Sequence, residues 1–121
     1  YEGRKRRCYS WMIAVGNTSS SARGMALVPA ARPDDEQLDA CIINGMGKFE
    51  LLLCVFPKVF RGRHLYHTGV DTIRGRHMTI ESDRPCEMYA DGELIGRLPV
   101  TLQAVPHALS VLVPAPSRNA L

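Results

Sequence analysis

The sequence has no apolar run long enough to cross a membrane. Its longest, from Leu51 to Phe56, falls well short of the roughly 18 residues that a spanning helix needs. Low-complexity tracts are also absent, and 45% of the residues are hydrophobic while 22% are charged. Such a composition is typical of a globular protein and excludes a disordered chain. We therefore expect a folded protein that is not integral to the membrane.

Several well-known catalytic and metal-binding motifs are missing as well. There is no GxSxG nucleophile elbow, no HExxH zinc motif, no Walker loop and no GxGxxG turn. Four cysteines occur, but none forms a CxxC pair or a Cys/His cluster with zinc-ligand spacing; they are Cys8, Cys41, Cys54 and Cys86. We predict reduced, buried thiols. If the chain handles a nucleotide, the loop that binds its phosphates lies elsewhere.

The length of 121 residues predicts a single domain with a core of its own. Eight prolines and ten glycines indicate many turns. The net charge of +3 is too small to indicate a nucleic-acid partner. Because the chain begins with Tyr1 and not with methionine, we expect a fragment of a longer protein.

Short segments of β-branched, aromatic and alternating residues recur between turn signals, which predicts a mainly β (α+β) fold of antiparallel strands. An Asp91-Gly92 pair predicts a tight hairpin, and we expect a meander in the C-terminal half. The domain should span residues 1–114, with 115–121 as a flexible tail. The predicted strands are Tyr9 to Val15, Met25 to Val28, Leu38 to Ile43, Val70 to Ile73, His77 to Ser82, Glu87 to Ala90, Leu94 to Ile95, Val100 to Val105 and Ala108 to Val113.

One segment, from Lys48 to Phe60, has helical periodicity. Its apolar residues recur at three- and four-residue spacing, at Phe49, Leu52, Leu53, Phe56 and Phe60. This stripe is predicted to face the core, so that the helix covers a sheet. Pro57 should kink or shorten the helix because it lacks a backbone N–H.

Charged residues gather in three places. One acidic group comprises Asp34, Asp35, Glu36 and Asp39; a second comprises Glu81, Asp83, Glu87, Asp91 and Glu93. Both lie in loops beside strands, where they could hold a hard cation or form solvated turns. A basic patch comprises Lys58, Arg61, Arg63, Arg74 and Arg76. It could bind a phosphate, rest on an anionic membrane or form a solvated face. The histidines near it, His64, His67 and His77, are assigned no role.

The C-terminal stretch has a more specific pattern. Residues 89–96 read Tyr-Ala-Asp-Gly-Glu-Leu-Ile-Gly, and Leu98-Pro99-Val100 and residues 105–114 follow. These segments resemble the end of the bacterial diacylglycerol kinase family, which includes the sphingosine-kinase-like and YegS-type lipid kinases. Upstream, residues 33–39 resemble the Asp-Asp-Gly-x-x-Asp segment of that family. Residues 15–18, Gly24-Met25 and residues 60–64 also match, so the resemblance covers nearly the whole chain in order.

The resemblance implies an antiparallel β-sandwich with one covering helix, the C-terminal domain of the diacylglycerol kinase and NAD kinase-like architecture. In a complete enzyme this domain adjoins an α/β nucleotide-binding domain with a Gly-Gly-Asp-Gly-Thr motif, which this chain lacks. The implied reaction moves the γ-phosphoryl group of ATP to a lipid hydroxyl, with diacylglycerol as the expected acceptor and phosphatidic acid as the product. The fragment by itself should be inactive.

The resemblance also implies roles for individual residues. Glu93, which follows Asp-Gly, corresponds to the catalytic base. Mg²⁺ would be bound by the Asp35 side chain and by backbone carbonyls of Arg32 and Gln37. Three further positions are implied to contact substrate, namely Asn17, Gly24 and Asp91.

Two departures from the family pattern favour an alternative. Glu36 stands where the family usually has glycine, and a positive φ there would cost about 1 kcal/mol or more. Ser21 to Arg23 replace a run of glycines. A noncatalytic β-sandwich that binds lipid or a partner therefore remains open. An NAD-kinase-like relative is a third reading, against which the Asp-Gly-Glu hairpin argues.

The expected setting of the protein follows from the same resemblance. A lipid kinase meets its substrate at a bilayer surface, so we expect a bacterial, cytoplasmic protein that associates peripherally with the membrane and acts in phospholipid biosynthesis. The basic patch is the candidate contact. No nucleic-acid partner is expected, and a homodimer is possible. The sequence does not show which lipid is phosphorylated.

Overall fold

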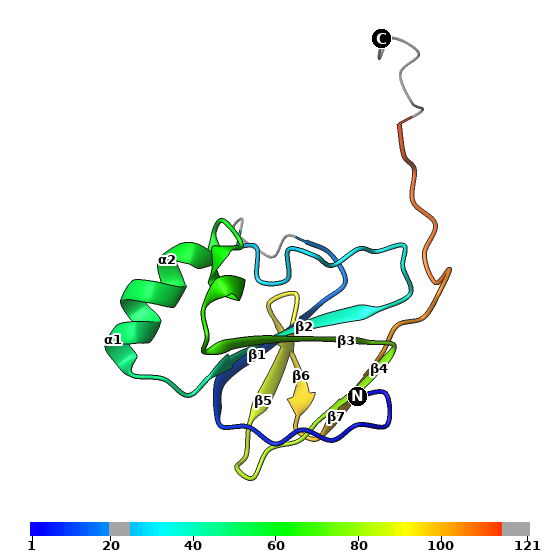
Figure 1. The fold of residues 1–121 in the computed structure, drawn as a ribbon. Helices are drawn as coiled ribbons and strands as arrows, with labels where there is room; N and C mark the ends of the chain where they lie inside the picture. The colour runs from blue at the N-terminus through cyan, green and yellow to red at the C-terminus, as the bar shows by residue number, and fades with distance from the viewer. Residues whose placement is uncertain (20–24, 115–121) are drawn as a thin grey trace, which may run out of the picture.

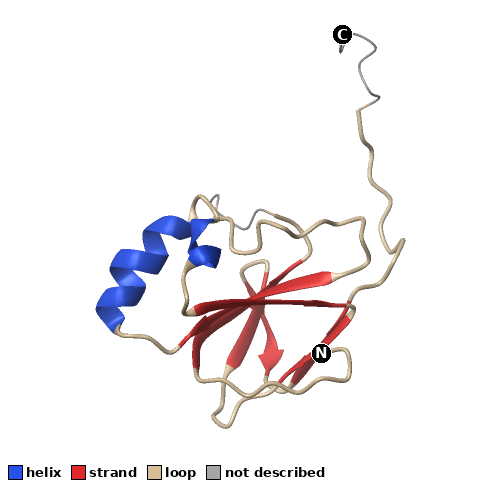
Figure 2. Ribbon diagram, in the orientation of Figure 1, coloured by secondary structure: helices blue, strands red, loops and turns tan. Residues whose placement is uncertain are grey.

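The computed structural model describes residues 1–19 and 25–114. Most of its regular structure is β, and the helices gather on one side of the molecule (Figure 2). The strands are β1 (Ser10–Gly16), β2 (Leu38–Asn44), β3 (Val70–Gly75), β4 (His77–Ile80), β5 (Glu87–Ala90), β6 (Glu93–Arg97) and β7 (Val100–Gln103). The helical pieces are α1 (Lys48–Glu50), a π-helical stretch η2 (Leu51–Val55), α2 (Phe56–Val59) and a 3₁₀ turn η3 (Arg63–Tyr66). The predicted mainly β class is confirmed. The predicted tail, 115–121, lies outside the described residues.

The central sheet has the order β1-β2-β3, with both pairs antiparallel. Its middle strand, β2, buries four consecutive residues, from Ala40 to Ile43. A strand covered on both faces has no need for polar alternation, which explains its continuous apolar sequence. Cys41 and Ile43 belong to the main core, together with Val28, Ala31, Val55, Val59 and Val70.

The remaining strands form two pairs, β4 with β7 and β5 with β6, so the meander expected for the C-terminal half is wrong. The β5–β6 hairpin lies between β4 and β7 in the sequence only, because β4 and β7 pair directly with each other. A meander would place β7 beside β6, but β7 pairs with β4, where Leu102 lies opposite the buried Met78. The predicted turn at Asp91-Gly92 is confirmed. Both residues have positive φ, 50° and 86°, as a two-residue type I′ turn requires.

Two predicted strands do not form. Met25 to Val28 is irregular, and its Ala26 N–H donates to the Val59 carbonyl at 3.0 Å, so this backbone bonds to the helix end and not to a sheet. Ala108 to Val113 has a strand-like sequence but no strand partner within the described residues. Figure 1 shows this segment leading away from the body after β7. A strand requires a neighbour for its backbone hydrogen bonds, so the sequence pattern by itself was insufficient.

The helical segment is continuous from α1 through η2 to α2 (Figure 1), but its orientation contradicts the prediction. The predicted core-facing stripe points outward: Phe49 is 81% exposed and Leu53 68%. Val55 and Val59, four residues apart, are the buried ones. The space beside β2 accepts these small β-branched side chains, and the bulkier apolar residues are left on the outside. Pro57 lies where the π-helical stretch η2 passes into α2, and the helical segment continues beyond it to Val59.

Candidate functional site

Glu93 is the first residue of β6 and pairs with Ala90 across the hairpin. The turn before it is Asp91-Gly92, in which Asp91 takes a left-handed conformation (φ 50°). Short two-residue turns fix strand register, so the backbone at Glu93 is tightly constrained. Its side chain is exposed, and no ion pair to it is formed by any residue within the described part of the chain. The carboxylate is therefore accessible to a ligand.

The loop before β2 carries the predicted metal residues. Asp35 accepts a hydrogen bond from the Gln37 N–H at its Oδ1, 3.1 Å away, which folds residues 35–37 into an Asx turn. Glu36, inside this turn, has φ 59°, so the positive φ considered from the sequence is present. Such a conformation is costly for a residue with a Cβ. The loop thus holds Asp35 in a defined orientation at the expense of strain at Glu36.

Two arginines of the predicted basic patch neutralise this acidic loop. Arg74, on β3, lies opposite Asp39 on β2 and binds it with two hydrogen bonds, of 2.8 Å from Nε and 3.2 Å from a terminal nitrogen. The side-chain hydrogen bond to Asp39 raises the pKa of Arg74 further above its usual value. Arg76 forms an ion pair with Glu36. Two of the five cations in the basic patch are therefore paired with acids.

The fit of a magnesium ion to this loop can be judged from its donor groups. The predicted set, one carboxylate with two backbone carbonyls and water, suits a hard cation. The second carboxylate oxygen of Asp35 lies 3.9 Å from an Arg74 nitrogen, beyond hydrogen-bond length. Arg32 directs its side chain to Asp34, at 3.3 Å, and so leaves only its backbone for a metal. The donor types suit the ion, while Arg74 places a positive charge beside the free oxygen of Asp35. Within 1–19 and 25–114, no group of three or more His, Cys, Asp or Glu is arranged to hold a metal ion, in this loop or elsewhere.

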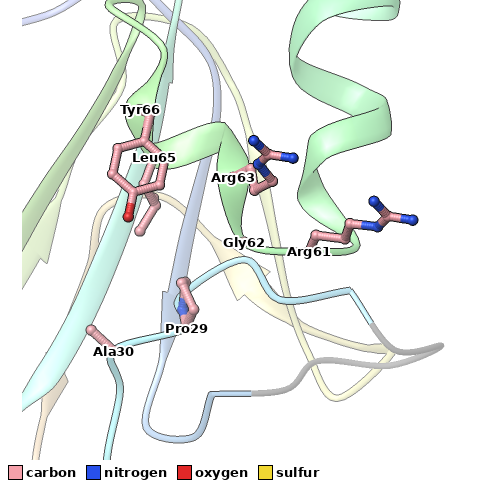
Figure 3. Close-up of a pocket in the computed structure, with 7 residues that line it drawn as sticks. All are labelled: Pro29, Ala30, Arg61, Gly62, Arg63, Leu65 and Tyr66. Carbon is pink, nitrogen blue, oxygen red and sulfur yellow. The ribbon is translucent and has the colours of Figure 1, made fainter.

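Two of the other basic residues, Arg61 and Arg63, line an open pocket that the sequence did not reveal. Its volume is about 710 Å³, and its lining residues are Pro29, Ala30, Arg61, Gly62, Arg63, Leu65 and Tyr66. Figure 3 shows the Arg61 and Arg63 side chains on the side of the helix, with Pro29 and Ala30 across from them. A neighbouring cavity of about 350 Å³ is lined by Lys58, Arg63 and Tyr66. Only tertiary structure brings residues 29–30 against 61–66.

Gly62 shapes this pocket through its backbone. It has φ 66° and precedes η3, and a Cβ at this position would lie 3.1 Å from the Pro29 ring. Glycine is therefore needed both for the turn and for the close approach of the two loops. One segment that contributed to the resemblance, residues 60–64, is thus part of the wall of a pocket.

His64 is a buried polar residue whose structural role the sequence did not indicate. Its side chain is fully buried, and Nε2 lies 3.0 Å from the Leu27 carbonyl oxygen, to which it donates. Its Nδ1 has no hydrogen-bond partner. His64 thereby connects η3 to the loop that lines the opposite wall of the pocket.

The remaining predicted site residues are not joined to one another. Asn17 lies exposed just after β1, and Gly24 lies outside the described residues. No hydrogen bond or ion pair between described residues connects Glu93 with the 32–37 loop. Glu93 is thus not bonded to the acidic loop, whereas Arg74 links Asp39 of the acidic group to Ala30 in the wall of the basic pocket.

Comparison with known proteins identifies the family. Residues 1–113 match the family described as "YegS C-terminal NAD kinase beta sandwich-like domain". The chain belongs to the YegS C-terminal domain family. This YegS-type domain is 35% identical over 99 residues to a protein of Mycobacterium tuberculosis named "Diacylglycerol kinase", covering 82% of the chain and 31% of that protein. It is 27% identical over 103 residues to "Putative lipid kinase YtlR" of Bacillus subtilis, covering 84% of the chain and 32% of the relative.

The YegS-type domain therefore spans about a third of the length of these relatives. Their names place it among proteins named as lipid kinases, and the predicted family and β-sandwich fold are confirmed. Among the described residues, no helix has both the length and the apolar character needed to cross a bilayer.

Of the four cysteines, only Cys41 is fully buried; Cys54 is intermediate, and Cys8 and Cys86 are exposed. All four are free thiols, but the expectation that they are buried holds for Cys41 alone. Burial raises the pKa of the Cys41 thiol to about 11. A thiol held neutral in this way is a poor nucleophile, so Cys41 serves as a small core residue.

Proposed function

We propose that this domain is the lipid-substrate and catalytic-base half of an ATP-dependent lipid kinase, and that diacylglycerol is its acceptor. The observation that carries the proposal is the family match across residues 1–113, with Glu93 held at the Asp-Gly hairpin. The relative named "Diacylglycerol kinase" supports the choice of acceptor.

Glu93 would act as a general base. Its carboxylate takes the proton of the lipid hydroxyl as the hydroxyl oxygen attacks the γ-phosphorus of ATP. The bond from the γ-phosphorus to the bridging oxygen breaks, and ADP leaves with that oxygen. General-base catalysis contributes about 10²–10⁴ in rate, which a rigid hairpin position favours. The nucleotide-binding part would come from a further domain of the same protein.

Asp35, with the backbone carbonyls of Arg32 and Gln37, would hold Mg²⁺. Bound there, the ion would supply positive charge that orders the loop. In the Asx turn, one carboxylate oxygen of Asp35 accepts a hydrogen bond from the Gln37 N–H, and the other oxygen is directed away from this N–H. Arg74 carries positive charge close to the same oxygen, so removal of the ion would leave a partly neutralised loop.

Lipid phosphorylation places the enzyme at a bilayer surface, and peripheral association with membrane follows from the proposal. Of the five cations in the predicted basic patch, Arg74 and Arg76 are paired with acids. Lys58, Arg61 and Arg63 are the cations that remain for this contact.

One observation favours a second candidate, a noncatalytic β-sandwich that binds lipid or a protein partner. The positive φ of Glu36 strains the loop proposed to hold the metal. A glycine at this position would relieve the strain, and an active enzyme would gain from that. Under this alternative the domain keeps its fold and its surface but transfers no phosphate.

The deciding measurement is phosphate transfer from labelled ATP to a lipid panel in mixed micelles with Mg²⁺, using the protein as its gene encodes it. We expect labelled phosphatidic acid from the unaltered protein and at least a 10²-fold lower kcat from Glu93→Gln. Glu81→Gln is the matched control, because Glu81 is also exposed and has no assigned role, and it should retain full activity.

Asp35→Asn tests the metal loop in the same assay. It should raise the Mg²⁺ concentration needed for half-maximal rate without abolishing transfer. If the unaltered protein remains folded and labels no lipid in the panel, the kinase proposal fails and the noncatalytic candidate stands.

A further inference from the structure

The helical segment from α1 to α2 is apolar on two faces. Val55 and Val59 face the core, while Leu51 is partly buried against it. Opposite them, large apolar side chains are left open to solvent, with exposed fractions of 53–81%: Phe49, Leu52, Leu53, Phe56 and Phe60. A surface helix normally carries polar residues on its outer face, and a large exposed apolar patch marks an interaction site. We call these five residues the outer helix face.

A group of cations adjoins the C-terminal end of this face. Lys58 lies within α2, and Arg61 and Arg63 follow it directly around the pocket of Figure 3. None of the three forms an ion pair with any residue in the described ranges. The acid on the same segment, Glu50, lies 3.2 Å from His67. The outer helix face therefore borders unneutralised positive charge.

We propose that the outer helix face docks on an anionic phospholipid surface. Its apolar side chains would enter the boundary between headgroups and acyl chains, while Lys58, Arg61 and Arg63 would contact lipid phosphates. This combination of an apolar face and flanking cations is typical of helices that lie in the membrane interface. The inference rests on the proposed function in one respect: docking would bring the enzyme to its lipid substrate.

The position of the charges favours a bilayer over a protein partner. Within the described residues the helix lies on one side, and the segment after β7 leads away elsewhere (Figure 1). Three unpaired cations beside the apolar residues fit a surface with many phosphates, and each contributes about fivefold in affinity for anionic lipid.

Sedimentation with lipid vesicles, using the whole protein as its gene encodes it, tests the proposal. We expect binding to vesicles of phosphatidylcholine with phosphatidylglycerol, and at least about tenfold weaker binding to phosphatidylcholine vesicles. Arg61→Glu with Arg63→Glu should weaken binding to the anionic vesicles by more than about tenfold. Arg84→Glu with Arg97→Glu changes the net charge equally at exposed positions elsewhere, and it should leave the affinity within about twofold.

The apolar contribution is tested separately by Phe49→Ser with Leu53→Ser. Both side chains are largely exposed, so the fold should be kept, which circular dichroism and the melting temperature would verify. We expect at least about a tenfold loss of binding that added salt does not mimic. Unchanged vesicle binding in this variant, or equal losses in the Arg84 and Arg97 control, would overturn the proposal.

Two further readouts separate this inference from its alternatives and from the proposed kinase. Light scattering would show whether the protein forms a dimer. If the Phe49 and Leu53 variant loses a dimer but keeps vesicle binding, the outer helix face binds a second copy and the proposal is overturned. Glu93→Gln should lose phosphate transfer yet bind vesicles normally. Conversely, the Phe49→Ser with Leu53→Ser variant should keep transfer to a short-chain diacylglycerol dispersed in detergent.

Discussion

At the residue scale, His64 shows how one buried side chain can join two distant parts of the chain. It has no exposed surface, and its Nε2 donates to the Leu27 carbonyl. Loss of this donor would remove the side-chain partner of the Leu27 carbonyl. The contact therefore stabilises both the 3₁₀ turn and the loop that faces it across the pocket.

We expect His64→Leu to lower the free energy of unfolding by about 0.5–1.5 kcal/mol, because it removes the hydrogen bond to the Leu27 carbonyl. Urea denaturation followed by circular dichroism would measure the change. His77→Leu is the control, since His77 is exposed and should change the stability by less than about 0.5 kcal/mol. Equal effects from the two substitutions would contradict a specific role for His64.

Glu36 is a residue at which sequence reasoning succeeded for a physical reason. Comparison with the family pattern showed a side chain where glycine is usual, and the structure gives this residue φ 59°. Backbone conformation at a single turn position can be inferred from such a departure because only glycine adopts positive φ without cost. The same reasoning could not show that Glu36 pairs with Arg76, a partner distant in sequence.

At the scale of elements, Arg74 holds the acidic loop against the central sheet. From β3 it reaches Asp39 on β2 with two hydrogen bonds and donates to the Ala30 carbonyl at 3.0 Å. The planar guanidinium can make all of these contacts together, which a lysine ammonium cannot reproduce. The loop that carries Asp35 therefore depends on β3 as well as on β2.

We expect Arg74→Lys to cost about 0.5–1 kcal/mol of global stability, since the pair is partly exposed. Its larger effect should be local. Amide hydrogen exchange at Gln37, whose N–H binds Asp35, should become faster, whereas exchange in the β5–β6 hairpin should not change. Arg97→Lys, on β6, serves as the comparison. Unaltered exchange at Gln37 would show that Arg74 does not order this loop.

The helical segment shows where periodicity is insufficient. The spacing of Phe49, Leu53 and Phe56 correctly predicted a helix, but Val55 and Val59 share the same four-residue spacing on another face. With two apolar faces, the sequence cannot decide which one meets the sheet. The shape of the space beside β2 decides it, and that space exists only after the strands have paired.

At the scale of the whole molecule, the N-terminus is attached to the point where β3 passes into β4. The Glu2 carboxylate accepts hydrogen bonds from the backbone N–H groups of Arg76 and His77. The bond from Arg76 is the main reason that the pKa of Glu2 lies below its usual value of 4.5. This contact joins residues 2 and 76 and thereby connects the first residues to two different sheets.

The lowered pKa makes this contact sensitive to acid. A carboxyl whose pKa is lower in the folded state adds stability above its unfolded pKa and loses it as the pH falls further. We therefore expect the melting temperatures of the unaltered protein and of Glu2→Gln to differ at pH 7 and to converge below about pH 4.5. Melting curves over this pH range would test it. A difference that persists at low pH would exclude the carboxylate as its cause.

The sequence alone determined the mainly β class, most strand positions, the Asp91-Gly92 hairpin and the family, because these depend on local pattern and short motifs. Tertiary structure decided which helix face is buried, that β4 pairs with β7, and that Arg74 and Arg76 neutralise the acidic loop while Arg61 and Arg63 border a pocket. These outcomes depend on contacts between distant residues. Local sequence restricts the conformation of each segment, but it does not specify which other segment will lie beside it.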